Sequence, residues 1–286
     1  MIAIADSGST KTDWALISDP LMIETSTVGF NPMFHDAKFV LSEIKKDTEL
    51  KTFQHKIEKV FFYGAGCSSP ERNEIIKKAL RQFFTNAKEI VVDHDLKGAA
   101  LAASEGKPSI VCILGTGSNS VFFDGRELHE EVPSLGYVLG DEGSGAWFGK
   151  QLLKVLLYKQ LPDDLEVLFY SDYRLTKEDV LTKIYREPNP NAYLASFMKF
   201  YAANVEHEFI KALLKKGFQE FYDCHIACFK NHKEVPVHFV GSVAFHFRDF
   251  LEILAKENGF SLGKIIQRPI DDLAGYYLKQ DANKFL

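Results

Sequence analysis

The chain opens with two apolar segments joined by a short polar loop, and this feature constrains the fold most. Residues 2–5 and 14–17 are apolar, and the loop Asp6-Ser-Gly-Ser-Thr-Lys-Thr12 lies between them. A connection this short predicts an antiparallel hairpin, because a crossover between parallel strands needs a dozen or more residues. A turn at Asp19-Pro20 then predicts a third strand over residues 21–28.

The same device recurs in the second half of the chain. Residues 109–114 and 120–123 are apolar, and Gly115-Thr-Gly-Ser-Asn119 joins them. Apolar spacing predicts further strands at 59–64, 89–92, 235–240 and 264–267. It predicts helices at 36–46, 69–84, 96–104, 144–159, 162–170, 177–185, 192 to about 229, 244–257 and 271–279. The pattern therefore indicates a duplicated α/β protein.

Net charge, hydropathy and cysteine content limit the classes of molecule that this protein can be expected to bind. The net charge of −5 argues against nucleic acid as the main partner, because binding to a phosphate backbone favours a basic surface. The absence of any run of about 18 apolar residues argues against a membrane partner. Cys224 and Cys228 are one helical turn apart and could form half of a metal site, but no second ligand pair follows the usual spacing. With no disulfide framework and no signal peptide, we expect a cytoplasmic protein.

The first polar loop has the chemistry of a phosphate and magnesium site. We expect Gly8 to permit a positive φ and a close approach of phosphate to the backbone. Successive backbone N–H groups in such a turn form an anion-binding concavity. Asp6 supplies a carboxylate for hydrated Mg²⁺, and Lys11 could balance phosphate charge. Hydroxyl donors come from Ser9, Thr10 and Thr12. The alternative is a plain hairpin turn rich in small polar residues.

The second polar loop repeats this chemistry. It offers Gly115 and Gly117 for close approach, and Thr116 and Ser118 for hydroxyl donors. Because each loop follows an apolar strand, the pair predicts a nucleotide site more strongly than either loop does alone.

These motifs resemble those of the N-acetylglucosamine kinase group. This group lies among the dehydratase and benzoyl-CoA reductase activator-type ATPases of the actin, sugar-kinase and Hsp70 superfamily. The resemblance rests on Asp6, Gly8, Thr10 and Thr12, on Gly115–Ser118, and on Gly140-Asp-Glu-Gly-Ser144. It implies a two-lobed actin-like (ribonuclease H-like) ATPase fold, duplicated, with a nucleotide cleft between the lobes. We expect an N-terminal lobe over residues 1–108, completed by a C-terminal helix at about 271–286, and a C-terminal lobe over 109–270.

The resemblance also implies a catalytic base. The group carries an Asp followed by small residues just after a strand, which Asp95-Leu-Lys-Gly98-Ala matches. A carboxylate at a strand end can accept a hydroxyl proton as the hydroxyl attacks the γ-phosphate. Asp93 is the alternative, because strand alternation directs it to the same face. Either residue could instead be the N-cap of the helix that follows.

Further residues are implied on the substrate side. Asn31, in Gly29-Phe-Asn-Pro32, resembles the sugar-binding Asn of the group, since an amide offers both a donor and an acceptor. The alternative is a simple Asn-Pro turn. Asp141 is implied as an acceptor for a sugar hydroxyl, or else it benefits from the dipole of the following helix, and Asn119 is placed with the substrate. Gly241-Ser242 is implied to close over the adenosine, although the usual form has two glycines.

The expected function is ATP- and Mg²⁺-dependent phosphorylation of an amino-sugar hydroxyl, with N-acetylglucosamine 6-phosphate as the leading product. Beyond this small-molecule sugar, a homodimer is a candidate assembly. One alternative is an ATPase activator of a reductase or dehydratase, which would need an iron–sulfur cluster. Cys224 and Cys228 do not match the glycine-flanked cysteines of those activators. A second alternative is a non-catalytic sugar sensor, against which Asp6 and Asp95 argue.

Overall fold

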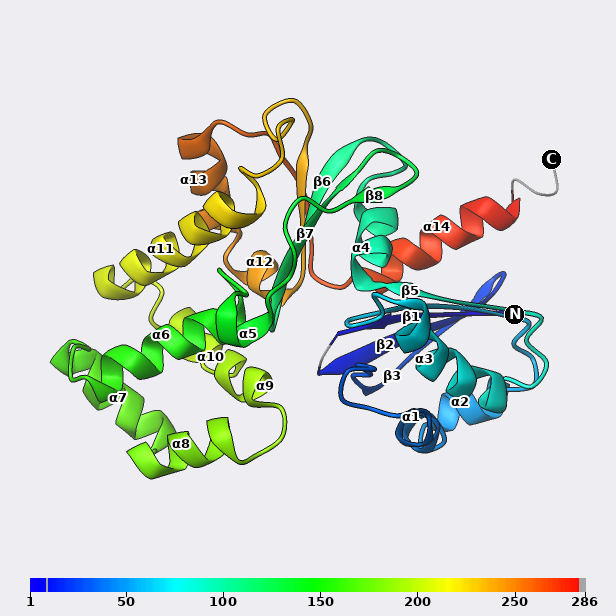
Figure 1. The fold of residues 1–286 in the computed structure, drawn as a ribbon, viewed down its shortest axis with the longest axis horizontal. Helices are drawn as coiled ribbons and strands as arrows, with labels where there is room; N and C mark the ends of the chain where they lie inside the picture. The colour runs from blue at the N-terminus through cyan, green and yellow to red at the C-terminus, as the bar shows by residue number, and fades with distance from the viewer. Residues whose placement is uncertain (9, 283–286) are drawn as a thin grey trace. The chain divides into compact units, whose positions relative to one another are not determined.

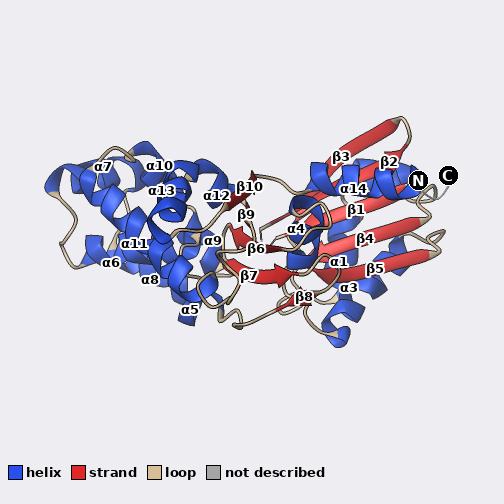
Figure 2. Cartoon of the chain, turned by 90° about the horizontal axis from the view of Figure 1, so that it is seen from above, coloured by secondary structure: helices blue, strands red, loops and turns tan. Residues whose placement is uncertain are grey.

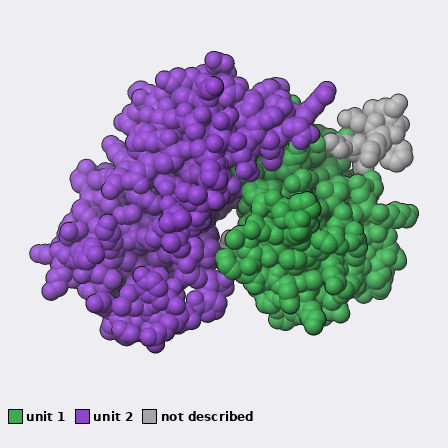
Figure 3. Space-filling view, in the orientation of Figure 1, with its two compact units in different colours: residues 1–106, 268–286 green, residues 107–267 purple. Residues whose placement is uncertain are grey.

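The chain divides into two compact units. The computed structural model describes residues 1–8 and 10–282, so Ser9 lies outside the described residues. Unit 1 comprises Met1–Gly106 and the segment that begins at Arg268, and unit 2 comprises Lys107–Gln267 (Figure 3). Within the described residues, no helix is both long enough and apolar enough to cross a membrane.

Unit 1 is built on a five-stranded mixed sheet. Its strands are β1 (Ile2–Ser7), β2 (Lys11–Ser18), β3 (Leu21–Val28), β4 (Lys59–Gly64) and β5 (Glu89–His94). Their order is β3-β2-β1-β4-β5, with β1, β2 and β3 antiparallel and with β4 parallel to both β1 and β5. The predicted opening hairpin and third strand are confirmed.

Helices cover both faces of this sheet (Figure 1). On one face lie α1 (Ala37–Ile44), α2 (Thr48–Phe53) and α3 (Pro70–Phe83), and on the other lie α4 (Asp95–Ala103) and α14 (Ile270–Ala282). Alternation along β4 explains the division, because successive side chains of a strand point to opposite faces. Phe62 joins the core under α1 and α3, whereas Phe61 stacks on Tyr277 of α14, with 4.1 Å between ring centroids.

Unit 2 repeats the same sheet topology. Its strands are β6 (Ser109–Leu114), β7 (Ser118–Phe123), β8 (Leu128–His129), β9 (Val237–Val240) and β10 (Leu262–Ile266). Their order is β10-β9-β6-β7-β8. Again three antiparallel strands come first, and two strands parallel to the first of them complete the sheet. The common order confirms the predicted duplicated α/β architecture.

Unit 2 contains more helix than unit 1 (Figure 2). Its described helices are α5 (Gly136–Leu139), α6 (Gly145–Leu157), α7 (Asp163–Tyr173), α8 (Lys177–Tyr185), α9 (Pro190–Ala195), α10 (Met198–Ala203), α11 (Glu208–His225), α12 (Ser242–His246) and α13 (Arg248–Asn258). Their buried faces form a phenylalanine-rich core that includes Phe148, Phe169, Phe200 and Phe218. This core supports the loop before α6, which contains Asp141.

The sequence pattern misplaces several boundaries in unit 2. The single run expected from 192 to about 229 consists of α9, α10 and α11, and the run expected over 244–257 is divided into α12 and α13. The apolar spacing continues through these breaks, so periodicity alone does not reveal them. The start of α11 is capped by His207, whose Nδ1 accepts from the backbone N–H of Phe209 at 3.1 Å. Histidine is not among the usual N-cap residues. The short elements α2, α5 and β8 were not predicted.

Candidate functional site

The β1–β2 hairpin presents the first polar loop at its tip. The N–H of Gly8 donates to the carbonyl of Lys11 at 3.0 Å, which closes the hairpin. The φ of Gly8 lies outside the positive range, so the expectation of a positive φ there is wrong. A Cβ at Gly8 would meet only the carbonyl oxygen of Lys11, at 3.8 Å, so the space for an approaching group is present.

Thr12 supports this loop from below. Its side chain is fully buried, its Oγ1 donates to the carbonyl of Val28 at 3.0 Å, and the same atom lies 2.7 Å from Oγ of Ser7. Ser7 Oγ in turn accepts from the N–H of Phe30 at 3.0 Å. The Thr12 hydroxyl is therefore directed into the protein. The sequence had suggested instead that this hydroxyl would donate to a phosphate. The hydroxyl ties the hairpin to the segment that leads to Asn31.

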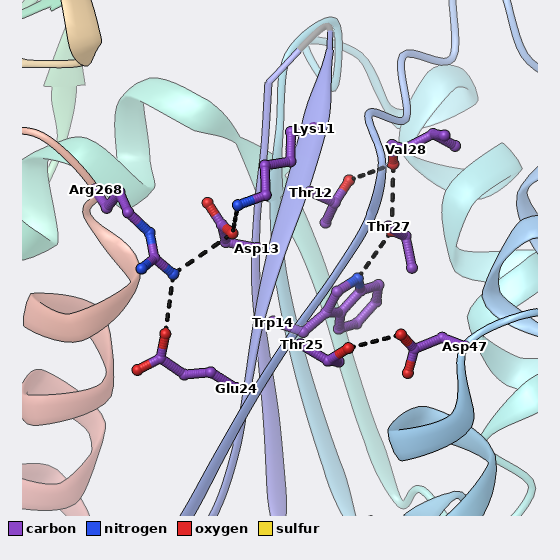
Figure 4. Close-up of polar contacts among 10 residues, drawn as sticks. All are labelled: Lys11, Thr12, Asp13, Trp14, Glu24, Thr25, Thr27, Val28, Asp47 and Arg268. Carbon is purple, nitrogen blue, oxygen red and sulfur yellow. Dashed lines mark hydrogen bonds and ion pairs between the residues drawn. The ribbon is translucent and has the colours of Figure 1, made fainter.

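Lys11 belongs to a charged network on the hairpin strands (Figure 4). Its Nζ lies 2.6 Å from Oδ1 of Asp13, and a guanidinium nitrogen of Arg268 lies 3.5 Å from the same oxygen. Arg268 also pairs with Glu24 at 2.9 Å. Lys11 is thus already paired with a carboxylate in this structure. Sequence reasoning missed Asp13 and Arg268; the hairpin register, which places Asp13 opposite Asp6, could have indicated Asp13.

Asp6 is a carboxyl group that lies within electrostatic reach of two others. Burial raises the pKa of Asp6 to about 7, the negative charges of Asp95 and Asp13 add to this effect, and Arg268 opposes it. A bound cation would remove most of this penalty, because it favours the charged carboxylate. In residues 1–8 and 10–282 no cluster of three ligating side chains forms a complete metal site. A single carboxylate such as Asp6 is the kind of protein ligand that Mg²⁺ uses when water and phosphate oxygens complete its shell.

The β5–α4 junction separates the two candidate bases. The N-cap of α4 is His94, whose Nδ1 accepts from the N–H of Leu96 at 3.3 Å, so neither Asp93 nor Asp95 is the N-cap. Asp95 is the first residue of α4, and its Oδ1 lies 2.9 Å from Nδ1 of His94. Asp93 accepts from the N–H of His94 at 2.7 Å. The charge of Asp95 acts on Asp6, whereas that of Asp93 is felt at Tyr63. Asp95 is therefore within electrostatic reach of Asp6, and the choice between the two candidate bases stays a prediction.

Asn31 was interpreted either as a sugar-binding residue or as part of an Asn-Pro turn. It is 7% exposed, and its Oδ1 accepts from the N–H of Met33 at 2.9 Å, so it does form a turn after the third strand. Gly66, with φ +78°, makes room for it, because a Cβ there would lie 2.3 Å from this Oδ1. Part of the acceptor capacity of this oxygen is therefore used by the turn. The expected contact of the Asn31 amide with sugar hydroxyls stays a prediction.

The second polar loop is fastened to the start of α6. The carbonyl of Gly115 accepts from the N–H of Gly145 at 2.8 Å, and the carbonyl of Thr116 accepts from Ala146 at 3.0 Å. Ser118 is buried, and its Oγ donates to the carbonyl of Glu142 at 2.8 Å. Ser118 thus holds the loop before α6, and its hydroxyl is not free for a phosphate, contrary to the sequence argument.

Asp141 has the most unusual environment in unit 2. It is 9% exposed and lies in the left-handed region, at φ 57°. Its Oδ1 lies 3.4 Å from the N–H of Ser118, and a Cβ at Gly117 would lie 3.0 Å from its Oδ2. Burial raises the pKa of Asp141 to about 6. It does not cap α6, because Ser144 Oγ accepts from Trp147 N–H at 3.1 Å. A buried carboxyl on strained backbone is typical of a functional residue.

Neutralising Asp141 should stabilise the protein. The pKa of Asp141 is higher in the folded protein than its unfolded value of 3.8, so ionisation of this group destabilises the fold. The destabilisation grows as pH rises from about 4 to about 6, and it is complete above pH 6. Asn keeps an acceptor for Ser118 and tolerates the left-handed region. We expect Asp141→Asn to raise the free energy of unfolding by up to about 3 kcal/mol near pH 7.5, and by little near pH 4. Urea unfolding at both pH values measures this change.

The control is Asp223→Asn on the exposed face of α11, which removes one charge at a solvated position. Equal effects of the two substitutions, or an Asp141 effect that does not depend on pH, would contradict the assigned environment of Asp141.

The contacts of Gly241, Ser242 and Asn119 are with neighbouring parts of the fold. Gly241 has φ +123°, and a Cβ there would lie 2.4 Å from the carbonyl oxygen of Leu114, so the neighbouring strand β6 already requires glycine. The adenine contact expected of Gly241 is not needed to explain it. Ser242 begins the short helix α12. Asn119 is half-buried in β7, and its Oδ1 accepts from the N–H of Ser120 at 2.8 Å.

Similarity to known proteins agrees with the fold and these motifs. Residues 5–215 match the BadF/BadG/BcrA/BcrD ATPase family. A candidate N-acetylglucosamine kinase from Porphyromonas gingivalis is 37% identical, with 98% of this chain and 100% of that chain covered and a TM-score of 0.93. A second such candidate, from Chromobacterium violaceum, is 18% identical, with 96% and 98% coverage and a TM-score of 0.73.

A more distant structure shares the fold alone. The ROK family glucokinase from Streptomyces griseus, solved with glucose and AMPPNP, is 12% identical over 96% of this chain and 97% of that chain, with a TM-score of 0.53. The chain has no match among curated proteins.

The two sheets of identical topology, each with a polar loop between its first two strands, define an actin-like ATPase fold. Within this class, the chain belongs to the BadF/BadG/BcrA/BcrD ATPase family.

Proposed function

We propose that this protein transfers the γ-phosphoryl group of ATP to a hydroxyl of an amino sugar, converting N-acetylglucosamine into its 6-phosphate. The observation that carries the proposal is the placement of two carboxyl groups at one end of the unit 1 sheet: Asp6 of β1 and the β5 end share a register through Tyr63 of β4, and Asp95 follows β5 directly. A carboxylate suited to a cation and a carboxylate suited to a proton lie close enough to repel each other. Phosphoryl transfer to a hydroxyl requires both groups at one site.

In this proposal the residues of unit 1 perform the proton and metal chemistry. Asp6 would hold the hydration shell of Mg²⁺, which supplies positive charge to the transferring phosphoryl group. Asp95 accepts the proton of the attacking sugar hydroxyl as the new O–P bond forms and the bond to the leaving ADP breaks. Asn31 NH₂ contacts the acceptor sugar. The hairpin backbone at Thr10 and Lys11 lies against the phosphates.

The proposed contributions of unit 2 are substrate positioning and phosphate contact. Asp141 accepts a hydrogen bond from a sugar hydroxyl, and Asn119 binds beside it. The backbone of Gly115–Gly117 approaches the phosphates, because a Cβ at Gly115 would meet nothing within 4 Å. Gly241 and Ser242 would lie on the nucleotide side. Because the substrates are ATP and a free sugar, the reaction belongs to the cytoplasm.

The relatives support this choice of acceptor. The candidate N-acetylglucosamine kinase from Porphyromonas gingivalis, 37% identical, matches 98% of this chain. The family description itself names an ATPase, so ATP hydrolysis without a sugar acceptor is the second candidate activity. The exposed Cys224 and half-buried Cys228 are both free, and no described cluster of ligating side chains accompanies them.

An ADP-release screen tests the proposal. The panel comprises N-acetylglucosamine, glucosamine, N-acetylmannosamine, N-acetylmuramic acid and glucose, each with ATP and Mg²⁺, and a reaction without sugar. We expect the strongest signal with N-acetylglucosamine and a low rate without sugar. A protein that releases no ADP with any sugar would refute the kinase assignment. An equal rate with and without sugar would favour the ATPase alternative.

A further inference from the structure

The loop Gly140–Ser144 rests on one face of helix α11. A Cβ at Gly143, where φ is +66°, would lie 2.9 Å from Cβ of Phe221 and 3.1 Å from the carbonyl oxygen of Gly217. Gly217, Phe221 and His225 follow one another at intervals of four residues, so they share a face of the helix. The loop that carries Asp141 is therefore shaped by α11 as well as by the β6–β7 loop.

His225 makes a specific polar contact with this loop. It is the last residue of α11, it is 5% exposed, and its Nε2 lies 3.2 Å from Oε2 of Glu142. The ring stacks on Phe221, with 5.0 Å between centroids. Within the described part of the chain, His225 Nδ1 is buried without a hydrogen-bond partner. Leaving a polar atom unpaired is costly, and a leucine would fill this volume without that cost. The contact with Glu142 is the compensating feature.

The contact separates two adjacent carboxylates. Glu142 is held twice, through its carbonyl by Ser118 Oγ at 2.8 Å and through its side chain by His225. Asp141 instead lies beside Gly117 and the N–H of Ser118. Lys150 of α6 interacts electrostatically with both carboxylates, so it does not distinguish between them. His225 distinguishes between the two carboxylates, because it contacts Glu142 and not Asp141.

We propose that His225 is a positioning residue, which holds the Glu142 carboxylate against α11 through an Nε2–H donor and so leaves Asp141 as the carboxylate presented to the sugar acceptor. The role of Asp141 in this inference rests on the proposed function. The contact between His225 and Glu142 rests only on the geometry of unit 2. The two parts can therefore fail separately.

Two substitutions at His225 distinguish positioning from packing. Gln can donate a hydrogen bond to Glu142, whereas Leu fills the volume and cannot. We expect His225→Leu to raise the KM for the sugar about tenfold, with the KM for ATP nearly unchanged, and His225→Gln to stay within about twofold of wild type. If His225 only fills space, Leu will be tolerated better than Gln. That result, or equal impairment by both variants, would overturn the proposal.

A titration provides a readout that needs no turnover. In His225→Leu the released Glu142 carboxylate repels Asp141 more strongly, which should raise the pKa of Asp141 by roughly half a unit. The ¹³C chemical shift of the Asp141 carboxyl measures this pKa, and in His225→Gln it should stay at the wild-type value. An unchanged pKa of Asp141 in His225→Leu would overturn the proposal, even if no sugar proves to be a substrate.

If His225→Leu does not fold, Glu142→Gln decides the question. It leaves the buried histidine intact and removes the negative charge that raises the pKa of His225 against the effect of burial. We expect the His225 imidazole in this variant to titrate roughly half a pH unit lower. An imidazole that titrates as in wild type would show that the contact between His225 and Glu142 is absent in solution.

Discussion

Asp95→Asn is expected to lower kcat for sugar-dependent ADP formation by two orders of magnitude or more, the usual scale for loss of an acid–base group. The substitution keeps an oxygen that can accept from the N–H of Leu96, as Asp95 Oδ1 does at 2.9 Å. It therefore removes the proton acceptor without removing the local hydrogen bond. It also removes a negative charge that acts on Asp6, so binding of MgATP should not weaken. Steady-state kinetics that vary ATP and sugar separately measure both effects.

Asp93→Asn is the matched control for this prediction. Its amide oxygen can still accept from the N–H of His94, which Asp93 contacts at 2.7 Å. We expect kcat to stay within a few-fold of wild type. A large loss in Asp93→Asn together with a small loss in Asp95→Asn would exchange the roles of the two residues.

Gly149→Ala is expected to produce the largest loss of stability. A Cβ at Gly149 of α6 would lie 2.0 Å from the carbonyl oxygen of Leu194 and 2.6 Å from the carbonyl carbon. Both atoms are backbone, so no side-chain rotation relieves the contact, and α9 would have to move away from α6. Overpacking a buried contact usually costs 1–3 kcal/mol, and we expect about 3 kcal/mol or more here. Chemical denaturation followed by circular dichroism measures the change.

Gly275→Ala provides a control with the same chemistry and the opposite sign. Gly275 lies within helix α14, and a Cβ there would meet nothing within 4 Å. Alanine is favoured over glycine inside a helix, so this variant should be more stable than wild type by about 0.5–1 kcal/mol. If Gly149→Ala behaves like Gly275→Ala, the close packing of α6 on α9 is incorrect.

The fold of unit 1 was largely predictable from the sequence. Its strands are short apolar runs bounded by polar residues, and Ser69-Pro70 marks the start of α3, where Ser69 Oγ accepts from the N–H of Arg72. Local signals therefore locate these elements, although β1 continues to Ser7 and β2 begins at Lys11, within the predicted polar loop. In unit 2 apolar residues recur at helical spacing from α9 to α11, and the breaks between these helices depend on tertiary packing and on an unusual histidine cap.

The candidate site was predictable in residue type but not in side-chain direction. Thr12 and Ser118 lie in the predicted loops, yet their hydroxyls donate to the carbonyls of Val28 and Glu142. Neither acceptor could be inferred from local spacing, because each comes from a distant part of the chain. The pairing of Arg268 with Asp13 joins residues 255 positions apart and depends on the same long-range packing.

Asp141 and His225 show a different limit of sequence reasoning. Asp141 was recognised from its motif, but neither its left-handed backbone nor the burial of its carboxyl beside Gly117 could be inferred from local spacing. His225 has no motif of its own. Only its place at the end of a long helix, against Glu142, suggests a role.

Identification of the product tests the central claim most directly. The protein is incubated with ATP, Mg²⁺ and N-acetylglucosamine, and the products are resolved by mass spectrometry and ³¹P NMR. We predict one sugar monophosphate, esterified at the 6-hydroxyl and formed in equal amount to ADP, with almost none in Asp95→Asn. Release of ADP with inorganic phosphate and no phosphorylated sugar would contradict the assignment of this protein as an amino-sugar kinase.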